Sequence, residues 1–191
     1  RRQRQMCIRD RRIFRPADIH ILRYAVCLVA TNPTKGFAMF GPMRHWQTQN
    51  VRGDWSGLFQ GVTIFKDARF QDATIGWVDI SGWNTGAATQ VKRLFKSTRG
   101  MSQDLTGWDV RGVETGGFED MFDGATGLDY DLRAAWAPSL APAATPSTAE
   151  FYGSTAGVER ASFPTNTACK AATKDALALA RHAEERETFE T

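Results

Sequence analysis

The sequence predicts an α/β repeat protein: a short solenoid with a helical N-terminal cap, a linker and a C-terminal helix. Three observations lead to this prediction. The phrase "DISGWNTGA" at residues 79–87 recurs as "DLTGWDVRG" at residues 104–112, 25 residues later. Tryptophans and phenylalanines alternate at a nearly constant distance, and short turn-like phrases follow the phenylalanines in the same phase. A fixed period of this length is typical of stacked repeats.

The aromatic spacing defines the repeat. A tryptophan precedes a phenylalanine by 12 to 14 residues and the next tryptophan follows after 13 or 14, so one unit has 25 to 28 residues. The turn phrases "FQGVT", "FKST", "FDGAT" and "FYGST" begin at residues 59, 95, 122 and 151. The segment "TIFKDARFQDATIGW", residues 63–77, departs from the period with roughly ten extra residues. The expected repeat-core residues are Trp46, Phe59, Trp83, Phe95, Trp108, Phe122 and Trp136.

Each unit contains apolar residues separated by Gly, Asp, Asn and Ser. The alternation in "LTGWDV", residues 105–110, predicts a short strand, and the flanking residues predict turns. A single unit cannot bury its apolar face, so stacking is expected to place Trp over Trp and Phe over Phe. We therefore expect three to four rungs across residues 41–136, with a further degenerate repeat at 149–163.

The N-terminal 40 residues divide into a basic tail and a helical cap. Residues 1–15 hold seven arginines against one aspartate, so the remaining chain is net negative although the whole is +3. The string "RQMCIRDR" resembles translated adapter read-through, and residues 1–12 are not expected to belong to the fold. The alternative is an arm that binds phosphates or anionic lipid.

The helical cap is expected at residues 16–40. Ile19, Leu22, Val26 and Val29 follow a helical period after Pro16, and Pro33 is expected to end the helix. The alternative is a signal-peptide core in "YAVCLVA", residues 24–30, but polar residues crowd its front. The chain contains no apolar run long enough to predict a membrane span.

The composition changes after Trp136. Residues 137–148 are rich in Ala and Pro, which predicts a flexible linker. Residues 168–188 are rich in strong helix formers and predict a C-terminal helix, either loosely docked or free.

The repeat resembles that of the BspA-type leucine-rich-repeat surface proteins. Their degenerate 25-residue unit has D-[IL]-[ST]-x-W-[DN] and M-F-x-x-A phrases, which "MSQDLTGWDVRGVETGGFEDMFDGA" at residues 101–125 follows almost throughout. The segment "LRYAVCLVATNPTKGFAMFGPMRHWQTQNVRGDWSGLF" is similar to the family's entry segment. The resemblance implies a leucine-rich-repeat-like solenoid and a surface or secreted protein for recognition or adhesion. It carries over no catalytic residue, because the family motif is a packing motif.

Enzymatic chemistry has little support in the sequence. His20, His45 and His182 form no metal-binding array, and no P-loop, G-x-S-x-G or G-x-G-x-x-G motif occurs. Three scattered cysteines argue against a disulfide framework and a zinc site, and Cys27 is expected to be a small buried hydrophobe. We therefore expect no enzyme activity, cofactor or metal.

Acidic residues are concentrated in the third unit, since residues 104–131 carry a net charge of −7. Stacking is expected to gather several onto one face that binds a basic partner or calcium; the alternative is a solvated turn face. Its candidate residues are Asp104, Asp109, Glu119, Asp120 and Asp123.

Two functions follow as hypotheses. The first is a non-enzymatic recognition or adhesion module that binds a protein or glycan, with no nucleic-acid partner. The second is a structural or vestigial fragment of a longer surface protein without a ligand of its own. Cell-surface or secreted localisation follows from the resemblance alone.

Overall fold

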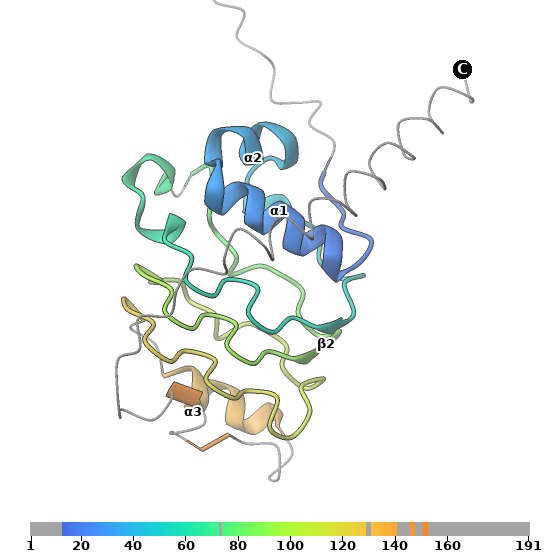
Figure 1. Ribbon diagram of the computed structural model, residues 1–191. Coiled ribbons are helices and arrows are strands. Elements are labelled where there is room, and N and C mark those ends of the chain that lie inside the picture. The colour runs from blue at the N-terminus through green and yellow to red at the C-terminus, as the bar shows by residue number, and fades with distance from the viewer. Residues whose placement is uncertain (1–12, 73, 129–130, 141–145, 148–150, 153–191) are drawn as a thin grey trace, which may run out of the picture.

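The computed structural model describes residues 13–72, 74–128, 131–140, 146–147 and 151–152. Two helices lie at one end, successive coils of the chain lie beneath them in layers, and a short helix lies at the other end (Figure 1). The predictions for residues 1–12 and for a helix at 168–188 concern residues outside those described. Of the expected repeat at 149–163, the structure describes Phe151 and Tyr152 alone.

The N-terminal cap consists of two helices, α1 (Ile19–Thr31) and α2 (Pro33–Phe40). The side chain of Asp18 caps α1 by accepting hydrogen bonds from the backbone of His20 and Ile21. α1 ends at Thr31, directly before Pro33 as expected, and the predicted cap contains a second helix that the sequence did not separate. Proline lacks an N–H that the first helical turn does not use, so Pro33 begins α2.

The helix α1 buries Leu22, Val26 and Val29 as the helical period predicts. Cys27 differs from its prediction, because it is half-buried and disulfide-bonded.

The remaining regular elements are short. They are η2 (Met43–His45), β1 (Gly53–Asp54), η3 (Ile64–Lys66), η4 (Ala68–Phe70), β2 (Ala88–Gln90), α3 (Leu132–Trp136) and η5 (Ala137–Ser139). β1 and β2 pair in parallel, with Gly53 opposite Ala88 and Asp54 opposite Gln90.

The predicted strand at residues 105–110 is wrong. Asp104 accepts hydrogen bonds from the backbone N–H and the hydroxyl of Thr106, and the N–H of Trp108 donates to the carbonyl of Leu105 at 3.0 Å. An aspartate that bonds the chain two residues later favours a turn over an extended strand.

A regular hydrogen-bond pattern joins neighbouring coils. In each coil every second N–H closes a four-residue turn, as in Leu58 N–H to Trp55 O, and N–H groups between them donate to the next coil. The N–H groups of residues 55, 57, 59 and 61 donate to the carbonyls of residues 90, 92, 94 and 96, in that order. In the same way, the N–H groups of residues 91, 93, 95 and 97 donate to the carbonyls of residues 117, 119, 121 and 123. All eight N···O distances lie between 2.7 and 2.9 Å. We call this set the cross-coil ladder.

The sequence separation between donor and acceptor in the cross-coil ladder shows the size of the insertion. The separation is 35 residues between the first two coils and 26 between the next two, so the first interval contains nine more residues. These belong to the insertion loop, residues 63–77, which includes η3 and η4. The loop packs against α2, where Phe37 lies 4.9 Å from Phe70 and 5.0 Å from Trp77 between ring centroids.

The turn that begins at the stacked phenylalanine of each coil has left-handed backbone at its third residue. Gly61 (φ +70°), Ser97 (φ +58°) and Gly124 (φ +64°) occupy this position in three successive coils. Non-glycine residues adopt this conformation at a cost, so glycine suits these turns best.

The interior contains aromatic side chains from every coil. Phe59 stacks on Phe95 and Phe95 on Phe122, each pair with centroids 5.3 Å apart, and Trp46 stacks on Trp83 at 5.7 Å. All seven residues expected in the repeat core are at most 4% exposed. No ring contact joins Trp83 to Trp108 among the described residues.

Instead, the indoles join the coils through hydrogen bonds. The indole N–H of Trp83 donates to the carbonyl of Met43 at 2.9 Å, that of Trp108 to Ile80 at 3.0 Å, and that of Trp136 to Leu105 at 3.1 Å. In each case the acceptor lies three residues before the tryptophan of the preceding coil. The buried hydroxyls of Thr48, Thr85 and Thr98 likewise donate to carbonyls of neighbouring coils.

The C-terminal end of the described chain is closed by α3 and by Phe151. Trp136 belongs to α3, and Phe151 is fully buried against Phe122, with centroids 5.0 Å apart. Within the expected linker at 137–148, residues 137–139 form η5, and the carbonyl of buried Pro146 accepts a hydrogen bond from Arg133.

We expect Trp108→Ala to lower the free energy of unfolding by about 3–5 kcal/mol, because it removes a buried ring and leaves the carbonyl of Ile80 unpaired. Urea titration of the full chain measures this loss. A Trp108→Ala variant that unfolds cooperatively at an unchanged midpoint would contradict the packing described above.

We expect Gly124→Ala to destabilise the chain by about 1–2 kcal/mol, because alanine is strained at φ +64°. Gly82→Ala is the matched control, since Gly82 is not left-handed and a Cβ there meets nothing within 4 Å. Equal thermal midpoints for the two variants would show that the turn does not require left-handed backbone.

Candidate functional site

The acidic residues of the third unit do not form a free acidic face. Glu119, Asp120 and Asp123 do lie together, but basic residues of the preceding coil pair with them. Glu119 contacts Lys92 at 3.3 Å, Asp120 contacts Lys96 at 3.0 Å, and Asp123 contacts Lys96 at 2.7 Å. Arg93 contacts both Glu119 and Asp120 at 3.6 Å. Three cations therefore balance three anions on this surface.

The other two predicted acids act locally. Asp109 pairs with Arg111 at 2.7 Å, and Asp104 accepts the two hydrogen bonds from Thr106. The expectation of one acidic binding face is thus corrected: the register of the coils places acids beside bases of the neighbouring coil.

Metal and membrane sites receive no support from the described part of the chain. Within it, no three His, Cys, Asp or Glu side chains come together as a metal would need. None of its helices has the length and hydropathy of a membrane span.

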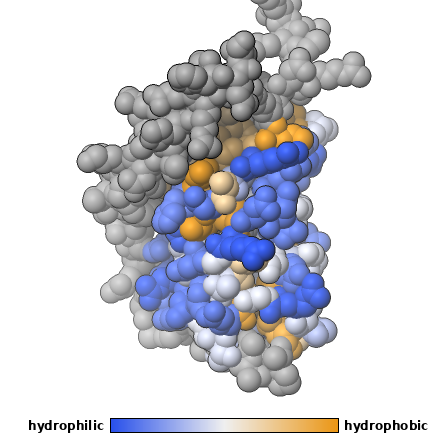
Figure 2. Space-filling model, turned by 90° about the vertical axis from the view of Figure 1, so that its right-hand side faces the viewer, coloured by the Kyte–Doolittle hydropathy of each residue, from blue (hydrophilic) through white to orange (hydrophobic). Residues whose placement is uncertain are grey.

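Few large hydrophobic side chains of the described residues are exposed. The face on the right of Figure 1 is largely hydrophilic, with hydrophobic side chains in separate areas (Figure 2). In the described residues the large hydrophobic side chains with high exposure are Ile13, Met39 and Ile75. Ile75 belongs to the insertion loop.

A pocket of about 160 Å³ lies at the insertion loop. Its apolar lining is Phe70, Trp77 and Val78. The polar lining is Arg44, Gln71, Asp72, Asp79 and Gln103. It therefore combines side chains from η2, from the insertion loop and from the following coil. We call it the Trp77 pocket.

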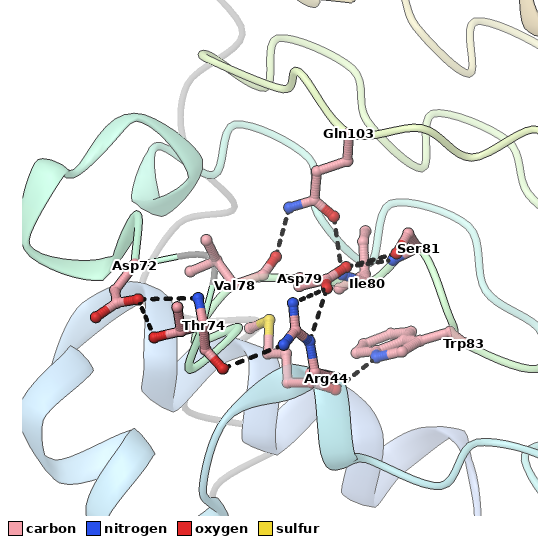
Figure 3. Close-up of polar contacts among 10 residues, drawn as sticks. Arg44, Asp72, Thr74, Val78, Asp79, Ile80, Ser81, Trp83 and Gln103 are labelled. Atoms are coloured by element: carbon pink, nitrogen blue, oxygen red, sulfur yellow. Dashed lines mark hydrogen bonds and ion pairs between the residues drawn. The ribbon is translucent and has the colours of Figure 1, made fainter.

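Arg44 and Asp79 form the centre of the polar wall (Figure 3). Arg44 Nε donates to Asp79 Oδ2 at 3.0 Å, and its Nη1 donates to the carbonyl of Thr74 at 3.2 Å. The guanidinium lies against Gly76, where a Cβ would be 2.4 Å from Arg44 Nε. Gly76 is thus required both by its φ of +66° and by this close approach.

Gln103 joins the pocket to the next coil. Its side chain accepts a hydrogen bond from the N–H of Ile80 and donates one to the carbonyl of Val78 (Figure 3). Because its amide is occupied on both sides, Gln103 acts as a wall of the pocket.

Trp77 differs from every other tryptophan of the chain. Five indole N–H groups donate to backbone carbonyls: those of Trp46, Trp55, Trp83, Trp108 and Trp136. The indole of Trp77 makes no such bond to any described residue, and its side chain is half-buried. Trp77 therefore lines the pocket, packs on Phe37 and Phe70, and has an indole donor that no described residue uses.

Asp72 contributes an unused acceptor. Both hydrogen bonds from Thr74 go to its Oδ1, so Oδ2 has no bond within the described chain. These bonds from Thr74 lower the pKa of Asp72, which keeps the carboxylate charged at neutral pH.

None of these pocket residues is among the candidate site residues that the sequence predicts. The available signal was Trp77 itself, a tryptophan outside the Trp–Phe period and inside the one segment that interrupts it.

A family model places the protein among known sequences. The model described as "Mycoplasma protein of unknown function, DUF285" matches residues 33–154. The chain belongs to this family. The matched region contains the insertion loop, the pocket and the cross-coil ladder. No curated protein and no solved structure matches the chain.

We expect Arg44→Met to raise the pKa of Asp79. Burial alone raises this pKa, but hydrogen bonds from Ser81 and Arg44 outweigh it and hold the pKa below its ordinary value. The stabilisation is therefore complete above the unfolded pKa of about 3.9 and is lost as the pH falls through the lower folded pKa. Carboxyl titration by NMR measures the shift, with Asp104 as the unaffected control. An unchanged Asp79 midpoint would show that Arg44 does not stabilise the carboxylate.

Proposed function

We propose that this protein is a short leucine-rich-repeat-like solenoid, similar to the BspA-type surface proteins, that acts as a non-enzymatic recognition module. The period of 26 residues in the cross-coil ladder and the recurring indole hydrogen bonds support the repeat interpretation. Cell-surface or secreted localisation belongs to the same proposal and rests on the resemblance.

The free indole of Trp77 is the observation that carries the recognition function. The repeats use their tryptophans to join coils, and each of those indoles has a carbonyl partner. Trp77 is instead placed at a pocket by a segment that the repeat does not need. A half-exposed tryptophan with an unused donor is typical of binding surfaces, because such a side chain offers apolar area and a directional bond together.

The pocket favours binding over catalysis. Arg44 and Asp79 neutralise each other, and Gln103 is bonded on both sides. Histidine, cysteine and serine are absent from its described lining, and of its two carboxylates Asp79 is paired with Arg44. These groups orient a ligand without supplying a reaction.

Binding of the full chain to printed glycan and peptide arrays tests this function. We expect at least one ligand class to bind the wild type, to be lost in Trp77→Ala and to be retained in Met39→Ala. Met39 is the matched control, because it is also an exposed large hydrophobic residue, 55% exposed on α2. Mass spectrometry of the bound ligand should show it unchanged.

Two results would contradict the proposal. One is binding that is identical in all three proteins, and the other is chemical conversion of the ligand. Absence of binding on both arrays would favour the structural alternative.

A further inference from the structure

We propose that the Trp77 pocket binds one neutral hexose unit of a glycan. This inference rests on the proposed recognition function and specifies its ligand. It follows from the size of the pocket, from the charges that line it and from the two hydrogen-bonding atoms that the fold leaves unused.

The size of the pocket suits one six-membered ring. Its volume of about 160 Å³ is close to that of roughly 150 Å³ cavities that accept benzene in other proteins. An extended peptide would place little more than one residue in such a space. The half-buried ring of Trp77 and the ring of Phe70 provide an apolar wall for the C–H groups of a sugar.

The charges of the pocket argue against charged ligands. Its charged lining is Arg44, Asp72 and Asp79, which gives a net charge of −1 and disfavours an anion. Arg44 already pairs with Asp79, so one carboxylate, that of Asp72, remains without a cation in the pocket.

The unused acceptor of Asp72 and the unused donor of Trp77 disfavour ligands that have hydrogen-bond donors but no acceptor. Lysine and arginine side chains have donors but no acceptor, so they could pair with Asp72 Oδ2 but leave the indole N–H of Trp77 unbonded. A hydroxyl group both donates and accepts. We therefore expect hydroxyls of a neutral sugar to bond Asp72 Oδ2 and the Trp77 N–H, while its C–H face packs on the ring.

NMR titration of the full chain tests the inference. The six tryptophans give six indole N–H signals, and the Trp77 signal is the one that disappears in Trp77→Phe. Methyl glucoside, methyl galactoside and methyl mannoside are the probes. We expect at least one to shift the Trp77 signal, with a Kd on the order of 1 mM for a ligand of this size, and to leave the other five unchanged.

Two variants separate the pocket from the turn that supports it. Asp72→Asn should weaken hexose binding about fivefold, because it replaces a charged acceptor but keeps the bond that Thr74 needs. Asp104→Asn is the matched control, since Asp104 accepts the same two hydrogen bonds from Thr106 but lies outside the pocket. It should bind hexose as the wild type does.

A hydrogen-bonding peptide and an anionic sugar complete the test. If triglycine amide or glucuronate shifts the Trp77 signal and no neutral hexose does, the hexose inference is wrong and the recognition function stands. If none of these probes shifts it and neither array shows binding that depends on Trp77, both proposals are wrong. Equal hexose affinity in Asp72→Asn and Asp104→Asn would also overturn the hexose site.

Discussion

The hydrogen bond from a buried indole to a carbonyl of the preceding coil is the interaction on which the rest of the structure depends. It serves Trp83, Trp108 and Trp136 in the same way, with N···O distances of 2.9 to 3.1 Å. A buried indole N–H without a partner costs free energy, so each tryptophan can enter the core only where the preceding coil presents a carbonyl. The bond thus fixes the height of one coil above the next, and the phenylalanines and the cross-coil ladder follow in the same register.

This register also determines the distribution of charge on the surface of the coils. Because the ladder brings residue 93 beside residue 119 and residue 97 beside residue 123, bases of one coil lie next to acids of the following coil. Lys96 illustrates the result: contacts with Asp123 and Asp120 raise its pKa, and the same contacts remove the negative charge that a basic partner would need. The side of the coils that carries the most acids in the sequence is therefore electrically balanced.

The sequence predicts burial better than it predicts backbone shape. The Trp–Phe spacing identifies buried residues because side-chain position along a repeat follows from period alone. The predictions of a strand at 105–110 and of an acidic face were wrong, because each depends on a partner that periodicity does not specify. At 105–110 the carboxylate of Asp104 stabilises a turn. On the expected acidic face Lys92, Arg93 and Lys96 neutralise the acids. The pocket could not be predicted because the insertion loop must first fold against Phe37 and Arg44. Trp77 was nevertheless visible as a tryptophan outside the repeat.

The contrast between five bonded indoles and one free indole separates the side chains that build the stack from the one that we propose for recognition. Hydrogen–deuterium exchange of the six indole N–H groups tests it most directly. We expect fast exchange for Trp77 and slow exchange for the five tryptophans that are hydrogen-bonded and at most 4% exposed: Trp46, Trp55, Trp83, Trp108 and Trp136. Protection of Trp77 equal to that of the other five, or fast exchange at Trp83 or Trp108, would contradict this expectation.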